Sequence, residues 1–369
     1  MSKSALIIFL GNIDYDSRTS NLYKSLTAHG YKVRVVSFDW LTKDFNTRTG
    51  EISVYKLTKG AFSISFYLKF LFILSINLIK HRADVIFAED IYTLPLAVLF
   101  GKIKKAKVFY DSRELYGYLA GLRKRRIIQR ILRWIENNFI HKVYRIITTG
   151  EMDAEFLKKE YGVDNTIVIR NLPVFKHIDE PFDFRKKYNL NPAIKIILYQ
   201  GVILHGRGLR LLFDVLDGIE NAAAVIIGGG EHKAYYEQLA VEKGVNKKVF
   251  FMGKVNQKDL LSYTAGADVG LAVIENISLS YYYALPNKMF EYILAGVPVF
   301  ASSFPQMKNI IDKYSVGVYA DPEDKAELTA AMKELLNNDE KRKILRENCK
   351  AASLELNWDI EAEKLFSDL

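Results

Sequence analysis

Short apolar segments alternate with helix-like segments along almost the whole chain, and this alternation constrains the fold more than any other feature. Strands that alternate with helices form parallel sheets whose two faces are covered. The sequence therefore predicts an α/β protein with two parallel sheets. The first series of apolar runs comprises Ala5–Leu10, Lys32–Phe38, Ala83–Ala88, Lys107–Asp111, Tyr144–Thr149 and Thr166–Arg170. The second series comprises Ile194–Gln200, Ala222–Ile227, Lys248–Met252, Val269–Val273 and Val297–Phe300.

A proline-containing stretch separates the two series, and the chain length also favours two domains. Residues 172–192 contain three prolines, and 369 residues are too many for one ordinary domain. An apolar fraction of 49% is enough to fill two cores. We expect an N-terminal domain over 1–172, a linker over 173–193 and a C-terminal domain over 194–350.

Polar residues and a glycine follow several strands of the first series. Gly11, Asp90, Asp111 and Glu151 come at strand ends, and Arg113 follows two residues after Asp111. Ligands of parallel sheets bind beyond the carboxyl ends of the strands. We therefore expect these positions to line one crevice, although ordinary loop chemistry explains any single one of them equally well.

Residues 280–299 contain the most informative local pattern. Pro286 suits the first turn of a helix because its missing N–H has no partner to lose there. Gly296 suits a left-handed C-cap, and a buried strand follows it. The pattern predicts a loop, a helix of about three turns, a cap and a strand. The apolar stripe of this helix comprises Met289, Phe290, Ile293 and Leu294.

The polar residues of the same helix indicate a nucleotide site. Asn287, Lys288 and Glu291 are three to four residues apart and share one face. The free amides at the helix start suit a phosphate, and a carboxylate one turn later can accept two hydrogen bonds from a ribose diol. The alternative, a buried helix with a solvated Lys and Glu, has equal weight on spacing alone.

The segment Leu285–Val299 resembles the donor-site helix of retaining glycosyltransferases of family 4, which have the GT-B fold. The resemblance implies two Rossmann-like domains facing each other across a cleft, with the nucleotide-sugar in the C-terminal domain and the acceptor in the N-terminal one. It also implies a last helix, 351–369, that packs back on the first domain. In the family, the residue at Glu291 binds the ribose, and the helix start, here Leu285, Pro286 and Asn287, binds the diphosphate.

The glycine-rich turns also match this family. Tyr199–Leu209, with Gly201 and Gly206, resembles its phosphate-binding turn, and Gly229 lies in the second such turn. Neither turn has the dinucleotide-binding pattern. Arg207 is found where the family places a basic residue on the diphosphate. The second basic residue of the family is replaced by Val202, so we expect Lys288 to supply that charge.

The family's pair of acids is incomplete in this chain. Glu291 matches the second acid, but Tyr283 stands at the position of the first. Glu275 is the nearest acid that could substitute for it. The acceptor side matches more loosely, through the segments that contain Gly11, Asp90, Asp111 and Arg113.

The resemblance implies a retaining glycosyltransferase that moves a sugar from a nucleotide-diphosphate sugar to a glycan or lipid-linked acceptor in cell-surface polysaccharide biosynthesis. Arg207, Lys288 and Glu275 are the expected catalytic residues. The cations would stabilise the leaving diphosphate, so we expect no required metal ion or other cofactor, with the nucleotide-sugar as co-substrate. The alternatives are a sugar-nucleotide epimerase of similar fold and a non-catalytic nucleotide-binding subunit.

The charge is unevenly distributed. Residues 1–173 contain 28 Lys and Arg against 16 Asp and Glu, whereas residues 174–369 contain 24 against 27. A basic half implies an anionic partner. Nucleic acid is disfavoured because the basic region lacks interleaved aromatic residues. An anionic membrane surface and a phosphate-bearing acceptor remain as the possible partners.

Two helical stretches bear on membrane contact. Phe62–Ile79 is long and apolar, but strands of one sheet precede and follow it, so it is a buried or a membrane-resting helix and does not span. Leu122–Ile140 combines an apolar stripe and Trp134 with basic residues, so it is either a membrane-interface helix or a domain helix with a solvated charged back. The stripe comprises Ile127, Ile128, Ile131, Leu132, Ile135 and Phe139, and the basic residues are Arg123, Lys124, Arg126, Arg130 and Arg133.

Two further observations concern the compartment. Cys349 is the single cysteine, which excludes an internal disulfide and fits a reducing environment. The apolar run at the N-terminus is short and lacks a cleavage site, so it predicts a first strand and no signal peptide. We expect a cytoplasmic protein, with peripheral attachment to the inner face of the membrane as the further hypothesis.

Overall fold

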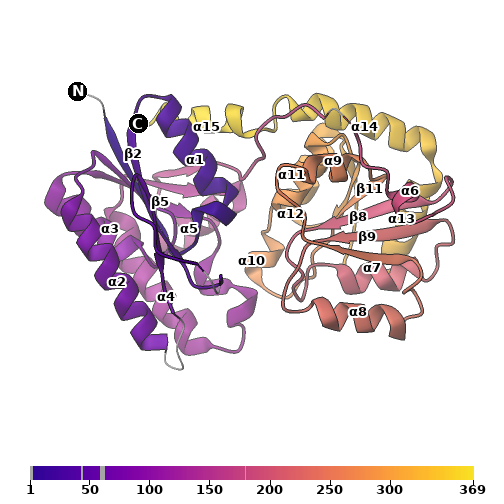
Figure 1. Cartoon of the computed structure of the whole chain (residues 1–369), viewed down its shortest axis with the longest axis horizontal. Coiled ribbons are helices and arrows are strands. Elements are labelled where there is room, and N and C mark those ends of the chain that lie inside the picture. The colour runs from indigo at the N-terminus through magenta and orange to yellow at the C-terminus, as the bar shows by residue number, and fades with distance from the viewer. Residues whose placement is uncertain (1–2, 43–44, 59–62, 179) are drawn as a thin grey trace. The chain divides into compact units, whose positions relative to one another are not determined.

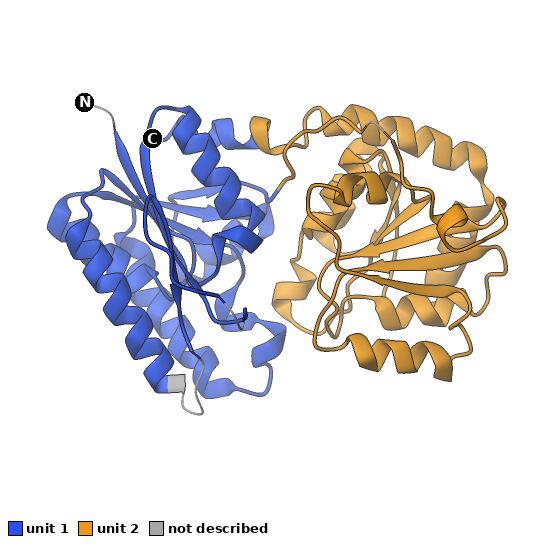
Figure 2. Ribbon diagram, in the orientation of Figure 1, with its two compact units in different colours: residues 1–171, 361–369 blue, residues 172–360 orange. Residues whose placement is uncertain are grey.

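The structure, a computed structural model, describes residues 3–42, 45–58, 63–178 and 180–369 of the chain (Figure 1). The chain divides into two compact units, shown in Figure 2. Unit 1 comprises residues 1–171 and 361–369, and unit 2 comprises residues 172–360. Both units consist of a parallel sheet with helices between the strands, which confirms the predicted α/β class.

The sheet of unit 1 is parallel throughout and has the strand order β3-β2-β1-β4-β5-β6-β7. Leu6 of β1 pairs with Arg34 of β2 on one side and with Ile86 of β4 on the other. The central strands β1 and β4 are almost wholly buried, as expected for continuous apolar runs covered on both faces. The strands are β1 (Ser4–Ile8), β2 (Lys32–Asp39), β3 (Ile52–Lys56), β4 (Val85–Ala88), β5 (Lys107–Ser112), β6 (Arg145–Thr148) and β7 (Thr166–Val168).

In the part of the chain that the structure describes, five long helices connect these strands. The third of them contacts both the second and the fourth, so these three helices lie side by side. The helix predicted over Phe62–Ile79 is observed as α2, and Phe62 lies outside the described residues. Among the described residues, no helix combines the length and apolar character needed to cross a membrane. The helices are α1 (Ser17–Ala28), α2 (Ser63–Lys80), α3 (Leu94–Lys104), α4 (Arg126–Phe139) and α5 (Glu151–Tyr161). Short 3₁₀ turns occur at Ile13–Tyr15, Tyr116–Tyr118, Ala120–Leu122 and Ile140–Lys142.

The end of the chain belongs to unit 1. Helix α15 (Trp358–Phe366) crosses the division at residue 360. The ring of Phe366 stacks on His29 at 3.5 Å between centroids, and Asp368 forms an ion pair of 2.9 Å with Arg145. The return to unit 1 therefore begins at residue 361, later than the boundary at 351 that we expected.

The sheet of unit 2 is also parallel, with the order β10-β9-β8-β11-β12-β13. Its two faces bury separate cores: Ile197 and Tyr199 of β8 contribute to one, and Ile196 and Leu198 to the other. This alternation follows from the two-residue period of a strand. The strands are β8 (Lys195–Gln200), β9 (Ala222–Ile227), β10 (Val249–Gly253), β11 (Val269–Ala272), β12 (Val299–Ser302) and β13 (Gly317–Ala320).

The segment that we predicted as a linker, 173–193, is part of unit 2. Phe184 is fully buried, and Phe182 packs on Tyr263 at 4.4 Å between ring centroids. The aromatic side chains of this segment therefore fix it to the core despite its prolines. The helices of unit 2 are α6 (Phe184–Lys187), α7 (Leu209–Leu216), α8 (Lys233–Glu242), α9 (Leu260–Ala265), α10 (Leu279–Tyr282), α11 (Asn287–Leu294), α12 (Pro305–Tyr314), α13 (Lys325–Asn337) and α14 (Asp339–Ser353).

Candidate functional site

The N-terminus of α11 has backbone amides without a side-chain cap. Pro286 is the N-cap residue and provides no side-chain acceptor. The first amides of a helix lack intrahelical partners and carry the positive end of the helix dipole. Gly296, with φ of +67°, follows the helix at its other end. Residues 287–294 form about two helical turns, so α11 is shorter than the three turns that we predicted.

Lys288 is the most unusual side chain of this helix. It is 8% exposed, and its Nζ lies 3.6 Å from the centre of the Tyr199 ring. Among the residues that the structure describes, this Nζ has no hydrogen-bond partner. Burial and the nearby charge of Arg207 hold the pKa of Lys288 well below its usual value, although Glu291 acts in the opposite direction. A buried amine without a hydrogen-bond partner is unfavourable, so this position would gain from a bound anion.

Glu291 lies one turn further along α11 and is held from the neighbouring strand. Its Oε2 accepts a hydrogen bond from the side-chain amide of Gln200, the last residue of β8. The Gln200 Oε1 in turn accepts from the hydroxyl of Thr264 at 2.8 Å. Burial raises the pKa of Glu291, and the contacts with Gln200 and Lys288 oppose this rise. The carboxylate is thus positioned by a chain of side chains that runs from Thr264 through Gln200.

Two glycine-rich turns lie side by side at the carboxyl ends of β8 and β9. The amide of Ile203 in the first turn donates to the carbonyl of Gly229 in the second at 2.9 Å. Gly228 has φ of +140°, and a Cβ at this position would lie 1.9 Å from the carbonyl oxygen of Gly201. Only glycine allows the two backbones to approach this closely. The two turns therefore form one continuous surface at the sheet edge where ligands of parallel sheets bind.

The first turn continues into α7 through two residues with left-handed backbone. Gly206 has φ of +79° and Gly208 has φ of +80°. A Cβ on Gly208 would lie 2.4 Å from the carbonyl oxygen of Val273, the residue after β11. Arg207, between them, is half-buried and lies 4.8 Å from the centre of the Tyr281 ring. The turn thus carries Arg207 close enough to Lys288 for its charge to lower the pKa of that lysine.

Glu275 lies beside this turn. Its backbone amide donates to the carbonyl of Gly206 at 2.9 Å. Its Oε2 accepts from Arg210 at 2.8 Å, while its buried Oε1 has no partner among the described residues. The carboxylate is only 7% exposed. Tyr283, which stands at the position of the family's first acid, is held by a backbone contact: its carbonyl accepts a hydrogen bond from the side chain of Gln306.

Unit 2 therefore gathers the residues that the sequence suggested for the nucleotide side. Gln200 and Thr264, which orient Glu291, and Arg210, which orients Glu275, were missed by the sequence analysis. Gln200 is the last residue of a predicted strand, so its position at the ligand-binding edge of the sheet could have been inferred from the sequence. The roles of Thr264 and Arg210 become recognisable only in the three-dimensional structure. The suggested residues are Gly201, Gly206, Arg207, Gly229, Glu275, Leu285, Pro286, Asn287, Lys288 and Glu291.

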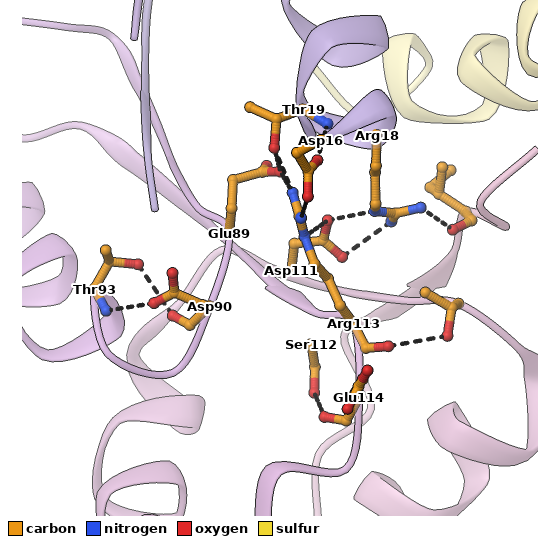
Figure 3. Close-up of polar contacts among 12 residues, drawn as sticks. Asp16, Arg18, Thr19, Glu89, Asp90, Thr93, Asp111, Ser112, Arg113 and Glu114 are labelled. Atoms are coloured by element: carbon orange, nitrogen blue, oxygen red, sulfur yellow. Dashed lines mark hydrogen bonds and ion pairs between the residues drawn. The ribbon is translucent and has the colours of Figure 1, made fainter. Parts of the chain in front are cut away.

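Unit 1 has its own cluster of charged residues, which Figure 3 shows. Arg18 of α1 donates to both carboxylate oxygens of Asp111, at 2.6 and 2.9 Å, and to the carbonyl of Ile169 at 2.9 Å. Both Arg18 and Asp111 are buried. The pair ties α1 to the carboxyl end of β5 and to the segment after β7.

Arg113 lies beside this pair. It donates to Asp16 at 2.7 Å, to the hydroxyl of Thr19 at 2.6 Å, and to Glu89. Burial raises the pKa of Glu89 to about 7, although the positive charge of Arg113 opposes the rise. Burial also acts to raise the pKa of Asp16, but the charge of Arg113 and the hydrogen bonds of Thr19 outweigh it and leave the pKa lowered.

The remaining residues predicted on the acceptor side also make internal contacts. Asp90 accepts hydrogen bonds from the amides of Leu10 and Thr93, at 2.5 and 2.8 Å. Burial raises the pKa of Asp90, and these hydrogen bonds oppose the rise. The carbonyl of Gly11 accepts from Phe38 at 2.8 Å. The carboxylates of Asp90 and Asp111 thus fix the loops at the carboxyl ends of β1, β4 and β5, and their role toward an acceptor stays a prediction.

Within the described ranges, no three His, Cys, Asp or Glu side chains are grouped so that they could hold a metal ion.

The two parallel α/β units, with a glycine-rich surface and a helix N-terminus in the second, define a class of two-domain α/β proteins. Family models support this class: "Glycosyl transferases group 1" matches residues 181–352, and "Glycosyltransferase Family 4" matches residues 17–172. The two models together cover most of the chain. The chain therefore belongs to the family 4, group 1 glycosyltransferases.

Curated relatives match over part of their length. The chain is 28% identical over 185 residues to an uncharacterized glycosyltransferase, MJ1607, of Methanocaldococcus jannaschii, covering 49% of this chain and 46% of that protein. It is 22% identical over 255 residues to the D-rhamnosyltransferase WbpZ of Pseudomonas aeruginosa, covering 63% of this chain and 61% of the relative. The chain thus spans about half the length of the curated relatives that it matches.

Solved structures match over nearly the whole chain. A sucrose-phosphate synthase from Thermosynechococcus elongatus has a TM-score of 0.81 at 17% identity, with 99% of this chain and 98% of that chain covered. Anabaena HepE, in complex with UDP-glucose, has a TM-score of 0.72 at 15% identity, with 99% of each chain covered. At this identity the likeness shows the fold, which is the two-domain GT-B fold, as predicted.

Proposed function

We propose that this protein is a retaining glycosyltransferase that transfers a sugar from a nucleotide-diphosphate sugar to a glycan or lipid-linked glycan. The observation that carries the proposal is Lys288, a buried amine without a partner among the described residues, in the first turn of a helix whose N-terminus has no side-chain cap. Glu291, one turn away, would accept the ribose hydroxyls. A diphosphate bound at this helix start would meet free amides and cationic side chains together.

In the proposed reaction, the bond between the anomeric carbon and the diphosphate oxygen breaks, and its electron pair stays on that oxygen. Arg207, Lys288 and the amides of α11 receive the developing negative charge. The acceptor hydroxyl then bonds to the anomeric carbon, and its proton passes to the departing phosphate oxygen on the same face of the sugar. Retention of the anomeric configuration follows from this geometry of attack. The side-chain cations supply the charge, so the reaction proposed requires no metal ion or cofactor.

Glu275 takes the place of the acid that is replaced by Tyr283. It lies against the turn that bears Arg207, and its Oε1 has no partner among the described residues. A hydroxyl of the donor sugar would satisfy this oxygen. Arg210, which already pairs with the other oxygen, would keep the carboxylate oriented.

Relatives support the proposed substrates without identifying them for this chain. HepE binds UDP and glucose or UDP-glucose, and WbpZ is named for the transfer of D-rhamnose. Another relative, from Mycobacterium leprae, is a phosphatidyl-myo-inositol mannosyltransferase, whose name includes a lipid acceptor. We accordingly propose an acceptor in cell-surface polysaccharide biosynthesis, a cytoplasmic location and an anionic membrane surface as partner.

A thermal-shift screen of nucleoside diphosphates tests the donor site first. A ligand at 100 times its Kd stabilises the folded protein by about 2.7 kcal/mol, which is readily detected. The stabilising base then selects the donors for transfer assays with and without a glycan acceptor. Stabilisation without turnover by any donor would instead indicate a nucleotide-binding subunit, and sugar-nucleotide isomerisation without acceptor would indicate an epimerase.

A further inference from the structure

Helix α4 exposes part of its apolar stripe, together with Trp134, to solvent. Ile127 is 72% exposed, Ile131 51% and Trp134 64%, whereas the buried positions of the helix are Leu132 and Glu136. The other part of the predicted stripe packs as in a domain helix, because Leu132 is buried and Ile135 and Phe139 are half-buried. The exposed apolar residues of α4 fit the membrane-interface interpretation.

The neighbouring helices extend this apolar surface. On α2, Ile64, Leu68 and Phe72 are each more than 60% exposed and lie four residues apart, so they form one stripe. On α3, Leu99 and Ile103 are 51% and 65% exposed and also share a face. Since α3 contacts both α2 and α4, we treat these eight residues as one surface, the α2–α4 apolar face. Single exposed hydrophobic residues are common, but a group of this size on three adjacent helices marks an interaction site.

The orientation of α4 separates apolar from basic residues. Arg133 forms an ion pair of 2.7 Å with Glu160 of α5, so that flank of α4 faces α5. Arg126 and Arg130 precede Arg133 by seven and three residues and lie on the same flank. The stripe of Ile127 and Ile131 lies on the other side of the helix, toward α3. The basic residues thus form a rim along one edge of the α2–α4 apolar face.

Further positive charge surrounds this rim. A pocket of about 260 Å³ opens beside Trp134, and Arg130 and Arg133 line it. Its one carboxylate, Glu160, is already paired with Arg133. The segment before α4 adds three exposed cations, and exposed lysines flank the face on α2 and α3. These cations are Arg123, Lys124, Arg125, Lys69, Lys80 and Lys102.

We infer that the α2–α4 apolar face docks the protein on an anionic lipid bilayer, with its side chains at the boundary of the acyl chains and its basic rim on the lipid phosphates. Amphipathic surfaces with Trp and basic residues bind membranes in this way, and each basic residue near an anionic surface adds to the attraction. A second copy of the chain fits less well, because a two-fold contact would bring two basic rims together. The inference rests on the proposed function for its purpose, since a lipid-linked acceptor would be met at the bilayer.

Vesicle flotation of the full chain tests the inference. We compare neutral phosphatidylcholine vesicles with vesicles that also contain phosphatidylglycerol, at low and high salt. The face variant carries Ile127→Ser, Ile131→Ser and Trp134→Ser, all at exposed positions. Its matched control carries Val241→Ser, Ile344→Ser and Leu354→Ser, which are 54–63% exposed in unit 2. A rim variant carries Arg123→Gln, Lys124→Gln, Arg126→Gln and Arg130→Gln.

Wild type should float with the anionic vesicles, and less so at high salt. The face variant should lose about tenfold or more in partitioning, while the control stays within about twofold of wild type. The rim variant should lose the preference for anionic over neutral vesicles. Wild type that stays unbound, or a face variant that floats like wild type, overturns the inference.

Two further measurements distinguish membrane docking from self-association and from the proposed donor site. Sedimentation that shows a wild-type dimer, dissociated in the face variant, without vesicle binding would assign the face to self-association and overturn membrane docking. The thermal shift by nucleoside diphosphates should be the same in all three variants. An intact shift without vesicle binding refutes only the membrane inference, whereas vesicle binding without any shift refutes only the proposed donor site.

Discussion

Unit 1 and unit 2 both place buried cations near the carboxyl ends of their strands, but the cations differ in what neutralises them. In unit 1, Arg18 and Arg113 are surrounded by carboxylates that they contact directly. In unit 2, Lys288 has an aromatic ring beneath it and no hydrogen-bond partner among the described residues. In the first arrangement carboxylates neutralise the cations, although Glu89 Oε1 and Arg113 Nε have no hydrogen-bond partner among the described residues, whereas the second arrangement gains from an added anion.

This difference separates a structural use of charge from a binding use. Removing one member of a complete buried pair leaves the other charge uncompensated, so stability falls. Removing a buried cation that has no partner relieves an unfavourable burial, so stability holds while ligand binding falls. Mutations in the two units should therefore have opposite signatures.

The largest effect on stability is expected for Arg18→Leu. This change leaves Asp111 buried without its bidentate partner, which should lower the free energy of unfolding by about 3–5 kcal/mol. Arg48→Leu is the control, because Arg48 pairs with Asp14 at 2.6 Å on the surface and should contribute about 1 kcal/mol or less. Urea denaturation of both variants gives the measurement. Equal midpoints for the two variants would show that the buried pair is not structural.

For Lys288→Met, we expect the opposite result. Turnover of the donor should fall by about 10²–10³, since the cation acts on the charge that develops in the leaving group, whereas the stability of the ligand-free protein should not fall. Lys313→Met provides the control, because Lys313 also lies beside a tyrosine ring, at 4.9 Å from Tyr314, but is exposed. Steady-state kinetics and urea denaturation together test this. Loss of stability with unchanged turnover would reverse the assignment of the two units.

Glu291→Gln should have a smaller effect, confined to nucleotide binding. A carboxylate that accepts hydrogen bonds from ribose contributes more than a neutral amide, so affinity should fall by about tenfold or more. The fold should persist, because Gln200 can still donate to the new side-chain oxygen. Calorimetric titration with the nucleoside diphosphate measures the change. A folded variant with wild-type affinity would remove Glu291 from the site.

A pH dependence of stability is expected to arise in unit 1. Burial raises the pKa of Glu89 from 4.5 to about 7, with Arg113 opposing the rise. Between about pH 4.5 and pH 7, Glu89 keeps its proton in the folded state and loses it in the unfolded state. The contribution of Glu89 to stability is therefore fully present below about pH 4.5 and is lost as the pH rises to about 7. Glu89→Gln should flatten the stability curve there, and exposed Glu155→Gln should not. Urea midpoints measured across this pH range provide the test, and unchanged curves for both variants would contradict it.

The fold was predictable because its signals are local. Continuous apolar runs such as Val85–Ala88 identify buried parallel strands, and glycines mark the turns between them. Strand β3 (Ile52–Lys56) was missed, because it is a short edge strand with partly exposed residues. The strand after α11 begins at Val299 and not at Val297, since Val297 and Pro298 complete the connection from the helix cap.

The candidate site was predictable where the chain itself brings residues together. Lys288 and Glu291 share a helix face by spacing alone, and Arg207 is fixed by the glycines around it. The contacts of Glu291 with Gln200, and of Arg18 with Asp111, join residues about 90 positions apart, which no spacing rule reveals. The sequence pattern also did not reveal which apolar residues are buried. Ile127 and Ile131 have the spacing of a core helix, yet both face solvent.

The central claim is that the start of α11, with Lys288, holds a diphosphate. The most direct measurement is calorimetric titration of wild type and Lys288→Met with the nucleoside monophosphate and diphosphate of the base that the thermal-shift screen selects. We predict that wild type binds the diphosphate at least about tenfold more tightly than the monophosphate, and that this preference largely disappears in Lys288→Met. Equal binding of the two nucleotides by wild type, or a preference that survives in the variant, would contradict the claim.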